Sequence, residues 1–367
     1  MYVEILKIIE AGLDNDKQKV INYSEKLSEI LKNKGNEKVS NKIEKLIKSK
    51  NTRLSSLDSL TSKPFDQDSK LEMVEVSIPT EDNDSLYFES FIEKEVVSFM
   101  ESIHSKEEFL EMGLEVENRL LLYGPPGTGK TSLAKYISYH TDLPLITVKL
   151  DALISSMLGS TSKNIRKVFD FASKQPCILF LDEFDVLAKV RDDKNELGEL
   201  KRVVNSLLQN IDSFSSDSIL IAATNHEHIL DSAVWRRFNT TLQLSLPNEG
   251  IRKDIIKEYS NIMENDFVKE SKKMNQLSKA MQDMSPADIK NIIQKTIKQA
   301  IITKKNKLLY SNLLYQIYIT NKLHDSSNEK FVEYLLENKV SQKDISFLLD
   351  ISLRQVRNII KGVDNNE

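Results

Sequence analysis

Apolar residues recur every three or four positions through residues 2–50, the spacing that places them on one face of a helix. Breaks at 14–16 and 33–35 divide this pattern into three short segments. We expect an N-terminal bundle of three helices over residues 1–50. It serves either to dock a partner or simply to cap the main domain.

A change of composition separates this bundle from the rest of the chain. Residues 51–70 are polar and rich in serine, as flexible linkers are. Residues 71–88 are acidic, with one short strand expected around 74–78. We therefore expect a linker and acidic segment over 51–88.

Short apolar runs alternate with helical patterns through the middle of the chain. The pattern predicts strands at 120–123, 145–149, 177–181, 218–223 and 240–245, with helices at 130–140, 162–174 and 196–211. This alternation predicts an α/β fold whose parallel sheet is covered by helices on both faces. Beyond residue 247 the pattern is helical, so we expect a large α/β subdomain over 89–246, a helical subdomain over 247–322 and a tail over 323–367.

Composition narrows the class of protein. The 367 residues are 40% hydrophobic and 29% charged, which excludes a wholly disordered chain or a fibre. No run approaches the ~18–20 apolar residues of a membrane span, and the N-terminus lacks the pattern of an export signal. The single cysteine, Cys177, excludes an internal disulfide. These features predict a cytoplasmic protein without membrane contact.

Charge is distributed unevenly along the chain. Residues 1–63 carry a net charge of +4, whereas residues 64–118 hold 3 basic against 16 acidic residues, a net −13. This asymmetry argues against a uniformly basic nucleic-acid binder. It indicates either a domain boundary or two solvated surfaces of opposite sign.

A glycine-rich loop follows the first predicted strand of the main body and opens the next helix. Its sequence, GPPGTGKT from Gly124 to Thr131, fits the pattern G-x-x-x-x-G-K-[ST]. Glycines let backbone N–H groups close around phosphate oxygens, and the helix N-terminus favours the same anion. Lys130 is expected to reach the β- and γ-phosphates and Thr131 to hold Mg²⁺. The predicted nucleotide contacts are Gly124, Pro125, Pro126, Gly127, Thr128, Gly129, Lys130, Thr131 and Ser132.

A second motif follows the strand predicted at 177–181. That apolar strand ends in Asp182 and Glu183, which would lie at the carboxyl edge of the sheet beside the phosphate loop. Asp182 is expected to complete the Mg²⁺ site with Thr131. Glu183 is expected to polarise the attacking water.

With these motifs, the sequence resembles AAA ATPases over about residues 90–320. The run ILIAATN at 219–225 looks like the strand that carries a polar sensor, Asn225, which orients the water. Ala287 stands in a segment similar to the start of the lid helix beside the adenine. The resemblance implies an AAA+ module of the P-loop NTPase fold with a helical lid, ATP and Mg²⁺ as cofactors, and ATP hydrolysis.

A further segment, LDSAVWRRF at 230–238, resembles the one that supplies arginine fingers to a neighbouring subunit. Its adjacent arginines, Arg236 and Arg237, are similar to those of the spastin and katanin branch. A guanidinium stabilises charge on the transferred phosphoryl group. The resemblance implies a homo-oligomer, a ring of six copies, with each nucleotide at an interface.

Met157, Leu158 and Gly159 stand where this family has its central pore loop. The first of the three is usually aromatic, and here Met157 offers a flexible apolar side chain that can still grip a polypeptide. The alternative is a structural loop without substrate contact.

The order of helical head, single ATPase and short tail resembles bacterial AAA ATPases that act with a subtilisin-like serine protease. Those pairs resemble toxin–antitoxin, plasmid-maintenance or phage-defence modules. The resemblance implies a protein substrate or a partner protease for this chain.

The C-terminal run from 342 to 361 has the apolar spacing of a helix-turn-helix. Asp350 occupies the turn, where a left-handed backbone is needed, and Ser352 is expected to cap the second helix. Two roles stay open for this tail, contact with DNA or docking of a partner or second copy. The residues expected to face outward are Arg354, Gln355, Arg357 and Asn358.

Overall fold

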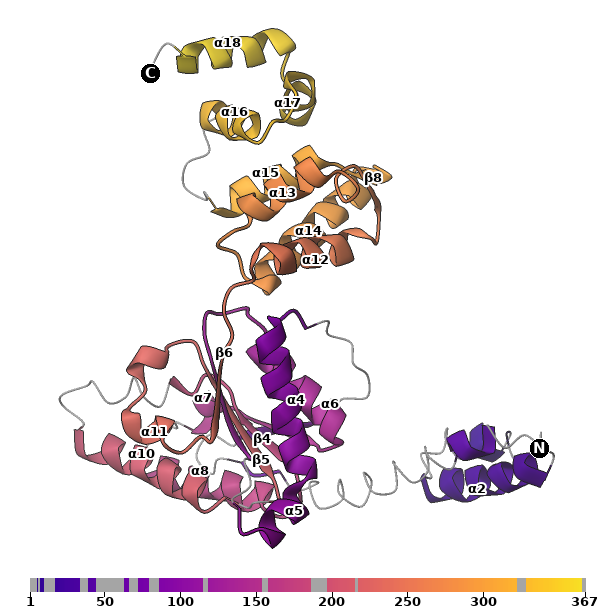
Figure 1. Ribbon diagram of the computed structural model, residues 1–367, viewed down its shortest axis with the longest axis vertical. Coiled ribbons are helices and arrows are strands. Elements are labelled where there is room, and N and C mark those ends of the chain that lie inside the picture. Colours follow the sequence, from indigo (N-terminus) through magenta and orange to yellow (C-terminus); the bar gives the residue numbers. More distant parts are fainter. Residues whose placement is uncertain are drawn as a thin grey trace.

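The computed structural model describes residues 5, 7–9, 17–33, 39–43, 63–65, 72–78, 86–114, 118–153, 158–185, 197–214, 217–321 and 328–364. Three parts follow one another from residue 72 onward: an α/β part, a helical lid and a three-helix tail (Figure 1). No helix within these ranges is long and apolar enough to cross a bilayer.

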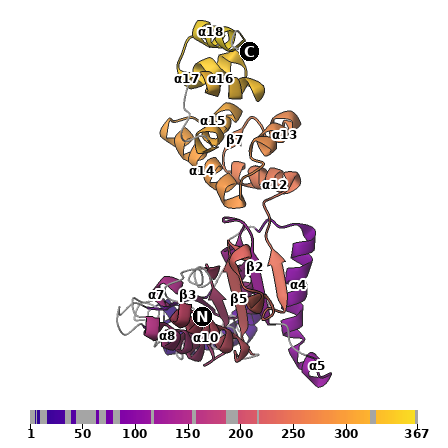
Figure 2. The same cartoon turned by 90° about the vertical axis from the view of Figure 1, so that its left-hand side faces the viewer.

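A six-stranded sheet forms the centre of the α/β part. Its strands are β1 (Val74–Ser77), β2 (Arg119–Tyr123), β3 (Leu145–Val148), β4 (Ile178–Leu181), β5 (Ile219–Thr224) and β6 (Thr240–Gln243). They lie in the order β1-β3-β4-β5-β2-β6. Figure 2 labels β2, β3 and β5 of this sheet. All neighbours are parallel except β1, which pairs antiparallel with β3 at one edge. The predicted parallel sheet is confirmed, and β1 adds an antiparallel edge strand.

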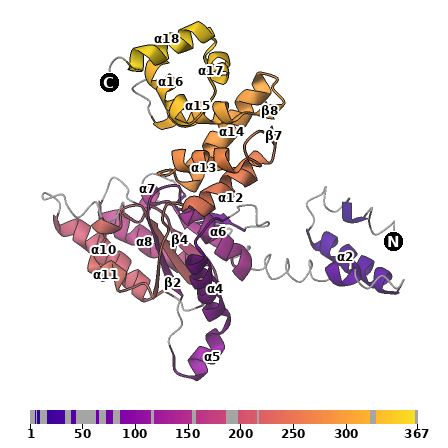
Figure 3. The same ribbon diagram turned by 45° about the horizontal axis from the view of Figure 1, so that its top comes forward.

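Helices cover both faces of this sheet (Figures 1 and 3). One face carries α4 (Ser90–His104) and α6 (Lys130–Thr141), and the other carries α7 (Leu150–Leu153), α8 (Leu158–Ala172) and α10 (Leu197–Asp212). Neighbouring strand residues point to opposite faces. In β2, Leu120 and Leu122 join the core beneath α4 and α6, whereas Leu121 joins the core beneath α8 and α10. This explains why the central strands β2, β3, β4 and β5 read as apolar runs.

The remaining helices of the α/β part are short. They are α5 (Lys106–Glu111), the 3-10 turn Glu227–Ile229 and α11 (Ser232–Trp235). The sequence over 91–112 has helical apolar spacing, and the structure divides this stretch into α4 and α5, which meet at Ser105. In Figures 1 and 3, α5 lies at the end of the α/β part away from the lid.

The lid begins directly after the sheet. It contains α12 (Glu249–Ser260), α13 (Ser271–Ala280), α14 (Pro286–Ile302) and α15 (Tyr310–Asn321). Two short parallel strands, β7 (Glu264–Asn265) and β8 (Lys307–Leu308), join its loops. The sequence pattern missed these strands, because two residues are too few to show a period.

The tail forms a three-helix unit that packs on the lid. Its helices are α16 (Asn328–Glu337), α17 (Gln342–Leu349) and α18 (Leu353–Asp364). Asp350 has the expected left-handed backbone, with φ 53°, and Ser352 Oγ accepts the N–H of Gln355 at 3.2 Å. Buried residues of lid and tail belong to one continuous apolar cluster, which includes Ile293 of α14 and Val332 of α16.

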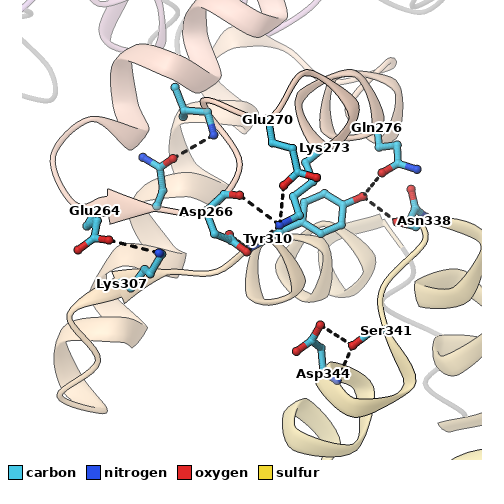
Figure 4. Close-up of polar contacts among 12 residues, drawn as sticks. Glu264, Asp266, Glu270, Lys273, Gln276, Lys307, Tyr310, Asn338, Ser341 and Asp344 are labelled. Carbon is cyan, nitrogen blue, oxygen red and sulfur yellow. Dashed lines mark hydrogen bonds and ion pairs between the residues drawn. The ribbon is translucent and has the colours of Figure 1, made fainter.

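A polar network joins the tail to the lid at Tyr310 (Figure 4). The buried Tyr310 hydroxyl lies 2.9 Å from Gln276 Oε1 on α13 and donates to the carbonyl of Asn338, just after α16, at 2.8 Å. Its backbone N–H donates to Asp266 Oδ1 at 2.7 Å. Lys273 lies 3.0 Å from the carboxylates of both Asp266 and Glu270. The tail is therefore anchored to the lid by polar contacts as well as by apolar packing.

Only parts of the predicted N-terminal bundle and linker lie within the described residues. Helix α2 (Lys17–Asn33) matches the second predicted helix. Residues 39–43 are helical as well, and Ser28 Oγ lies 2.9 Å from Ser40 Oγ between the two segments. The first helix is described only at residues 5 and 7–9, and most of the 51–70 linker is outside the described residues.

Candidate functional site

The glycine-rich loop joins the end of β2 to the first residue of α6. Gly124, Gly127 and Gly129 all have positive φ, at 135°, 76° and 99°. This is backbone that side-chain-bearing residues rarely adopt. A Cβ at Gly124 would overlap the carbonyl oxygen of Leu244, and one at Gly127 would overlap the Ser285 side chain. The glycines are therefore needed both for the turn and for close contact with its neighbours.

Lys130 is the first residue of α6, and its side chain folds back over the loop. Its Nζ donates to the carbonyls of Gly124 and Pro125 at 2.7 and 2.8 Å. Burial lowers the pKa of the ammonium, and the carboxylates of Asp182 and Asp185 oppose that change. The lysine is thus a partly desolvated cation at the loop, where an anion would offer it better partners.

Thr131 and Asp182 meet although they come from different motifs. The Thr131 hydroxyl donates to Asp182 Oδ2 at 2.9 Å, because α6 begins beside the carboxyl end of β4. A hydroxyl and a carboxylate are oxygen ligands of the kind that Mg²⁺ prefers. The donor set at this point therefore fits a magnesium ion held together with phosphates.

Glu183 has an unusual backbone for a glutamate. Its φ is 53°, in the left-handed region, and its N–H donates to the Asp182 carboxylate at 2.9 Å. Strained backbone of this kind gathers at functional sites, where the surroundings hold it in place. The neighbouring Phe184 is buried, and its N–H donates to the carbonyl of Ala223 on β5 at 2.8 Å. This bond ties the strained turn to the sheet and leaves the Glu183 side chain exposed.

Asn225 follows β5 and lines the same cleft. Its Oδ1 is buried and has no hydrogen-bond partner within the described part of the chain. Behind it, the hydroxyl of Thr224 donates to Asp185 at 3.1 Å, which fixes the end of β5 against the end of β4. A buried, unpaired amide oxygen is costly unless another molecule provides its donor. Its position suits a bound water at the cleft.

The cleft lies between the loop, the sheet edge and the lid, and it encloses about 340 Å³. The predicted residues that line it are Pro126, Gly127, Thr128, Gly129, Lys130, Thr131, Ser132, Asp182, Glu183, Asn225 and Ala287. Gly124 and Pro125 contribute through their carbonyls to Lys130 instead. The lid reaches the loop directly, since the N–H of Ala287 donates to the carbonyl of Gly127 at 3.2 Å.

Six further residues line the cleft. One is Pro286, next to the predicted Ala287, and the other five were missed by the sequence reasoning. Those five are Leu86, Tyr87, Phe88, Tyr259 and Lys290. The first three precede α4, and the Phe88 ring would lie 3.6 Å from a Cβ at Gly129. On the lid, Lys290 Nζ lies 5.3 Å from the centre of the Tyr259 ring, a cation–π contact. These residues belong to no short motif, and only the three-dimensional fold brings them to the loop.

Arg236 and Arg237 lie after α11, outside the cleft of their own chain. Arg237 Nε lies 3.0 Å from a carboxylate oxygen of Asp212, and its Nη1 donates to the Ala233 carbonyl at 2.6 Å. Arg236 is exposed, and its guanidinium makes no hydrogen bond or ion pair with the described residues. Trp235 packs edge-on against Tyr123 at the end of β2, with ring centres 5.1 Å apart, which anchors this segment to the sheet.

The remaining predicted site residues lie elsewhere. Met157 is outside the described residues, and the backbones of Leu158 and Gly159 form the first turn of α8 rather than a loop. On the tail, the four predicted outward residues of α18 are exposed, as expected: Arg354, Gln355, Arg357 and Asn358. Gln355 Oε1 accepts hydrogen bonds from the N–H and hydroxyl of Ser352, so part of its amide serves the helix cap.

Comparisons with known proteins agree with this geometry. Residues 120–246 match the family described as "ATPase family associated with various cellular activities (AAA)". An uncharacterized AAA family ATPase, y4kL, of Sinorhizobium fredii is 42% identical over 214 residues, which cover 58% of this chain and 63% of the relative.

Proteasome-activating nucleotidases are further relatives. The protein of Methanococcus maripaludis is 37% identical over 206 residues, covering 54% of this chain and 49% of its own length. That of Saccharolobus solfataricus is 33% identical over 234 residues, covering 62% and 58%. The chain thus spans about half to two thirds of the length of these relatives.

Proposed function

We propose, from the AAA ATPase domain that residues 120–246 form, that this chain hydrolyses ATP and uses the energy to remodel or thread a protein substrate. The contact that carries the proposal is the 2.9 Å hydrogen bond from Thr131 to Asp182. It joins the two motifs of a phosphate-cleaving site beside a loop of three left-handed glycines.

Each described residue has a chemical task in this reaction. The loop N–H groups and Lys130 would bind the β- and γ-phosphates, and Lys130 would exchange its two loop carbonyls for phosphate oxygens. Thr131 and Asp182 would hold Mg²⁺, which neutralises phosphate charge. Glu183 would accept a proton from the water that attacks the γ-phosphorus, while ADP departs with the bridging oxygen. Asn225, with its unpaired buried oxygen, would orient that water.

We further propose that a second copy completes each site. Arg236 lies outside its own cleft and has no partner within the described residues, so it is available to a neighbouring copy. When each copy supplies its guanidinium to the next in one direction, the contact is heterologous, and such contacts form a closed ring when the rotation between copies closes. Six copies are proposed from the resemblance to AAA ATPases. Some of the relatives are proteasome-activating nucleotidases, which supports a protein substrate for this chain.

We propose, more specifically, that this chain acts together with a partner protease. The order of helical head, ATPase and short tail supports a role beside a subtilisin-like protease in a bacterial toxin–antitoxin or phage-defence module. In this role the ring would regulate the protease or deliver its substrate. Met157, Leu158 and Gly159 are the residues proposed to grip the polypeptide.

Replacement of the proposed base tests the central claim. Glu183→Gln should retain ATP binding and lower turnover by roughly 10²–10⁴-fold, because the water loses its proton acceptor. Phosphate release and the binding of a fluorescent ATP analogue measure the two effects. Glu333→Gln, an exposed glutamate on α16, is the matched control and should change neither. Undiminished turnover in the Glu183 variant would contradict the assigned role.

A second candidate is an ATPase switch that the tail targets to DNA. The observation in its favour is that Arg354, Arg357 and Asn358 are exposed on one helix and make no side-chain hydrogen bond or ion pair with the described part of the chain. Because lid and tail share a core, the test uses the full chain with the Glu183→Gln trap. Duplex binding should weaken steeply between 50 and 200 mM salt, following the phosphate-contact rule, and Arg354→Ala with Arg357→Ala should abolish it. Salt-independent or undetectable binding leaves the tail as a docking module.

A further inference from the structure

Two polar residues are buried directly behind the nucleotide cleft, and the reaction described above does not use them. Asp185 belongs to the turn after β4 and is 4% exposed, and Thr224 is the last residue of β5 and is fully buried. Neither side chain lines the cleft. A carboxylate or a hydroxyl away from water is costly unless it makes hydrogen bonds, so the contacts of these two residues indicate their role.

The Thr224 side chain connects two segments of the chain. Its hydroxyl donates to Asp185 Oδ1 at 3.1 Å and accepts the backbone N–H of His226 at 3.0 Å. A hydroxyl has a single hydrogen to donate, so the bond to Asp185 uses it, while the N–H of His226 takes a lone pair of the same oxygen. The hydroxyl is therefore a bridge between the turn after β4 and the chain beyond β5.

Asn225 lies between the two residues that this hydroxyl holds. On one side, Thr224 is fixed in the sheet, where it lies opposite Tyr123 of β2. On the other side, the N–H of His226 donates to the threonine, and its carbonyl accepts the N–H of Ile229 at 3.1 Å. The backbone conformation decides which side-chain directions are open to a residue. The Asn225 amide therefore enters the cleft from a fixed position.

Asp185 belongs to the same turn as the proposed base, Glu183. A second bond, from the N–H of Phe184 to the carbonyl of Ala223 at 2.8 Å, lies one residue earlier along both segments. Two neighbouring bonds thus join the turn after β4 to the end of β5. One segment carries the Glu183 carboxylate and the other carries the Asn225 amide, so the distance between these groups depends on this double connection.

We propose that Asp185 and Thr224 are positioning residues for ATP hydrolysis, whose hydrogen bond holds the Asn225 amide at a fixed place relative to the Glu183 carboxylate. Both of these groups have to meet one water molecule at the γ-phosphate. A displacement of about 1 Å at a reacting group can cost roughly 100-fold in rate. The aspartate and the threonine touch neither the nucleotide nor the water, and they act through Asn225. This inference rests on the role proposed for Asn225.

Removal of the Thr224 hydroxyl tests the proposal in the full chain. Thr224 is the better residue to change, because the Asp185 carboxylate also favours the charged form of Lys130. Thr224→Val should lower kcat roughly 10–100-fold and leave the KM for ATP within about twofold, since the nucleotide keeps its contacts. Thr224→Ser keeps the hydroxyl and should retain the parent kcat. Phosphate release at varied ATP concentration measures both constants.

Combination with Asn225→Ala separates positioning from a merely structural role. Asn225→Ala alone should lower kcat, and the addition of Thr224→Val should lower it no further, because the hydroxyl acts through an amide that is already missing. Thr296→Val is the matched control, since the buried Thr296 hydroxyl donates to the Ile292 carbonyl within α14 at 2.7 Å. The control should retain both constants. Thermal melts verify folding, and Thr224→Ala replaces Thr224→Val if that variant does not fold.

The outcomes distinguish this inference from the proposed function. A parent-like kcat in the folded Thr224→Val chain would overturn the inference, and so would an equal further loss of kcat in the Asn225→Ala background. In both cases a low kcat of Asn225→Ala alone leaves the role of Asn225 standing. Asn225→Ala with the parent kcat would contradict that role, and the positioning by Asp185 and Thr224 would fail with it.

Discussion

Arg236 and Arg237 are adjacent in the sequence, but their different surroundings indicate different roles. Arg237 is held by Asp212 at the end of α10 and by the carbonyl of Ala233, so it fixes the segment after α11. Arg236 has an exposed guanidinium that is not engaged within the described residues. We therefore propose that Arg236 reaches a neighbouring site and that Arg237 positions the segment that carries it.

The two alanine variants should separate these tasks. Arg236→Ala should lower turnover by roughly 10³-fold or more with an unchanged melting temperature. Arg237→Ala should cost up to about 1 kcal/mol of stability, because its ion pair is partly exposed. Turnover assays and thermal melts measure both effects.

A mixture of two variants tests whether Arg236 acts on the nucleotide site of a neighbouring copy. Chains with Arg236→Ala and chains with Glu183→Gln are each inactive, but a mixed ring contains some sites with an intact glutamate and an intact neighbouring arginine. The mixture should regain part of the turnover. A mixture as inactive as its components contradicts the assignment of Arg236.

Single elements show what could be predicted from the sequence. The central strands β2, β3, β4 and β5 follow from their apolar runs, because these strands are buried on both faces, whereas the edge strands β1 and β6 are partly exposed. The Thr131–Asp182 contact was expected, since it arises between two motifs that end at one edge of the sheet. Cys177 is buried as a small apolar residue, and burial raises the pKa of its thiol to about 12.

Other features could not be predicted, because they depend on tertiary contacts. The lid side of the cleft, with Tyr259 and Lys290, forms only when α12 and α14 pack together. The left-handed backbone of Glu183 depends on the bond from Phe184 to β5, which a linear pattern does not reveal. Leu158 and Gly159 were expected in a loop, whereas the start of α8 includes them.

The contact between the glycine-rich loop and the start of α14 leads to a prediction about these two elements. A Cβ at Gly127 would overlap the Ser285 hydroxyl and lie in tight contact with Ala287, so Gly127→Ala should displace the lid from the loop and weaken ATP binding roughly tenfold or more. Titration with a fluorescent ATP analogue measures the change. Gly250→Ala on α12, where an added Cβ has ordinary space, should bind as the parent does. Equal affinities in both variants would show that the loop tolerates the side chain.

At the scale of the molecule, lid and tail act as one body. They share a buried cluster, and the Tyr310 network in Figure 4 joins α13 and α15 to the segment after α16. Movement of the lid must therefore carry α18 with it. The position of the tail therefore follows the position of the lid, whichever partner the tail contacts.

Removing one hydroxyl tests this coupling. Tyr310→Phe leaves the Asn338 carbonyl without its donor and should weaken the junction by about 1–3 kcal/mol. Amide hydrogen exchange in α16–α18 should rise, while basal ATP turnover stays unchanged. Tyr315→Phe is the matched control, since its ring packs on Phe331 without a hydroxyl bond among the described residues. Exchange that rises equally in both variants would contradict a specific role for Tyr310.

Rigid attachment of α18 at the end of the molecule farthest from the sheet has a mechanical consequence (Figure 1). A small rotation of the lid about the segment between β6 and α12 would move the last helix through a longer arc than the residues at the cleft. A small rotation of the lid would therefore produce a large displacement of the tail. A fluorescent dye attached to the tail would detect such a rotation more sensitively than a dye at the cleft.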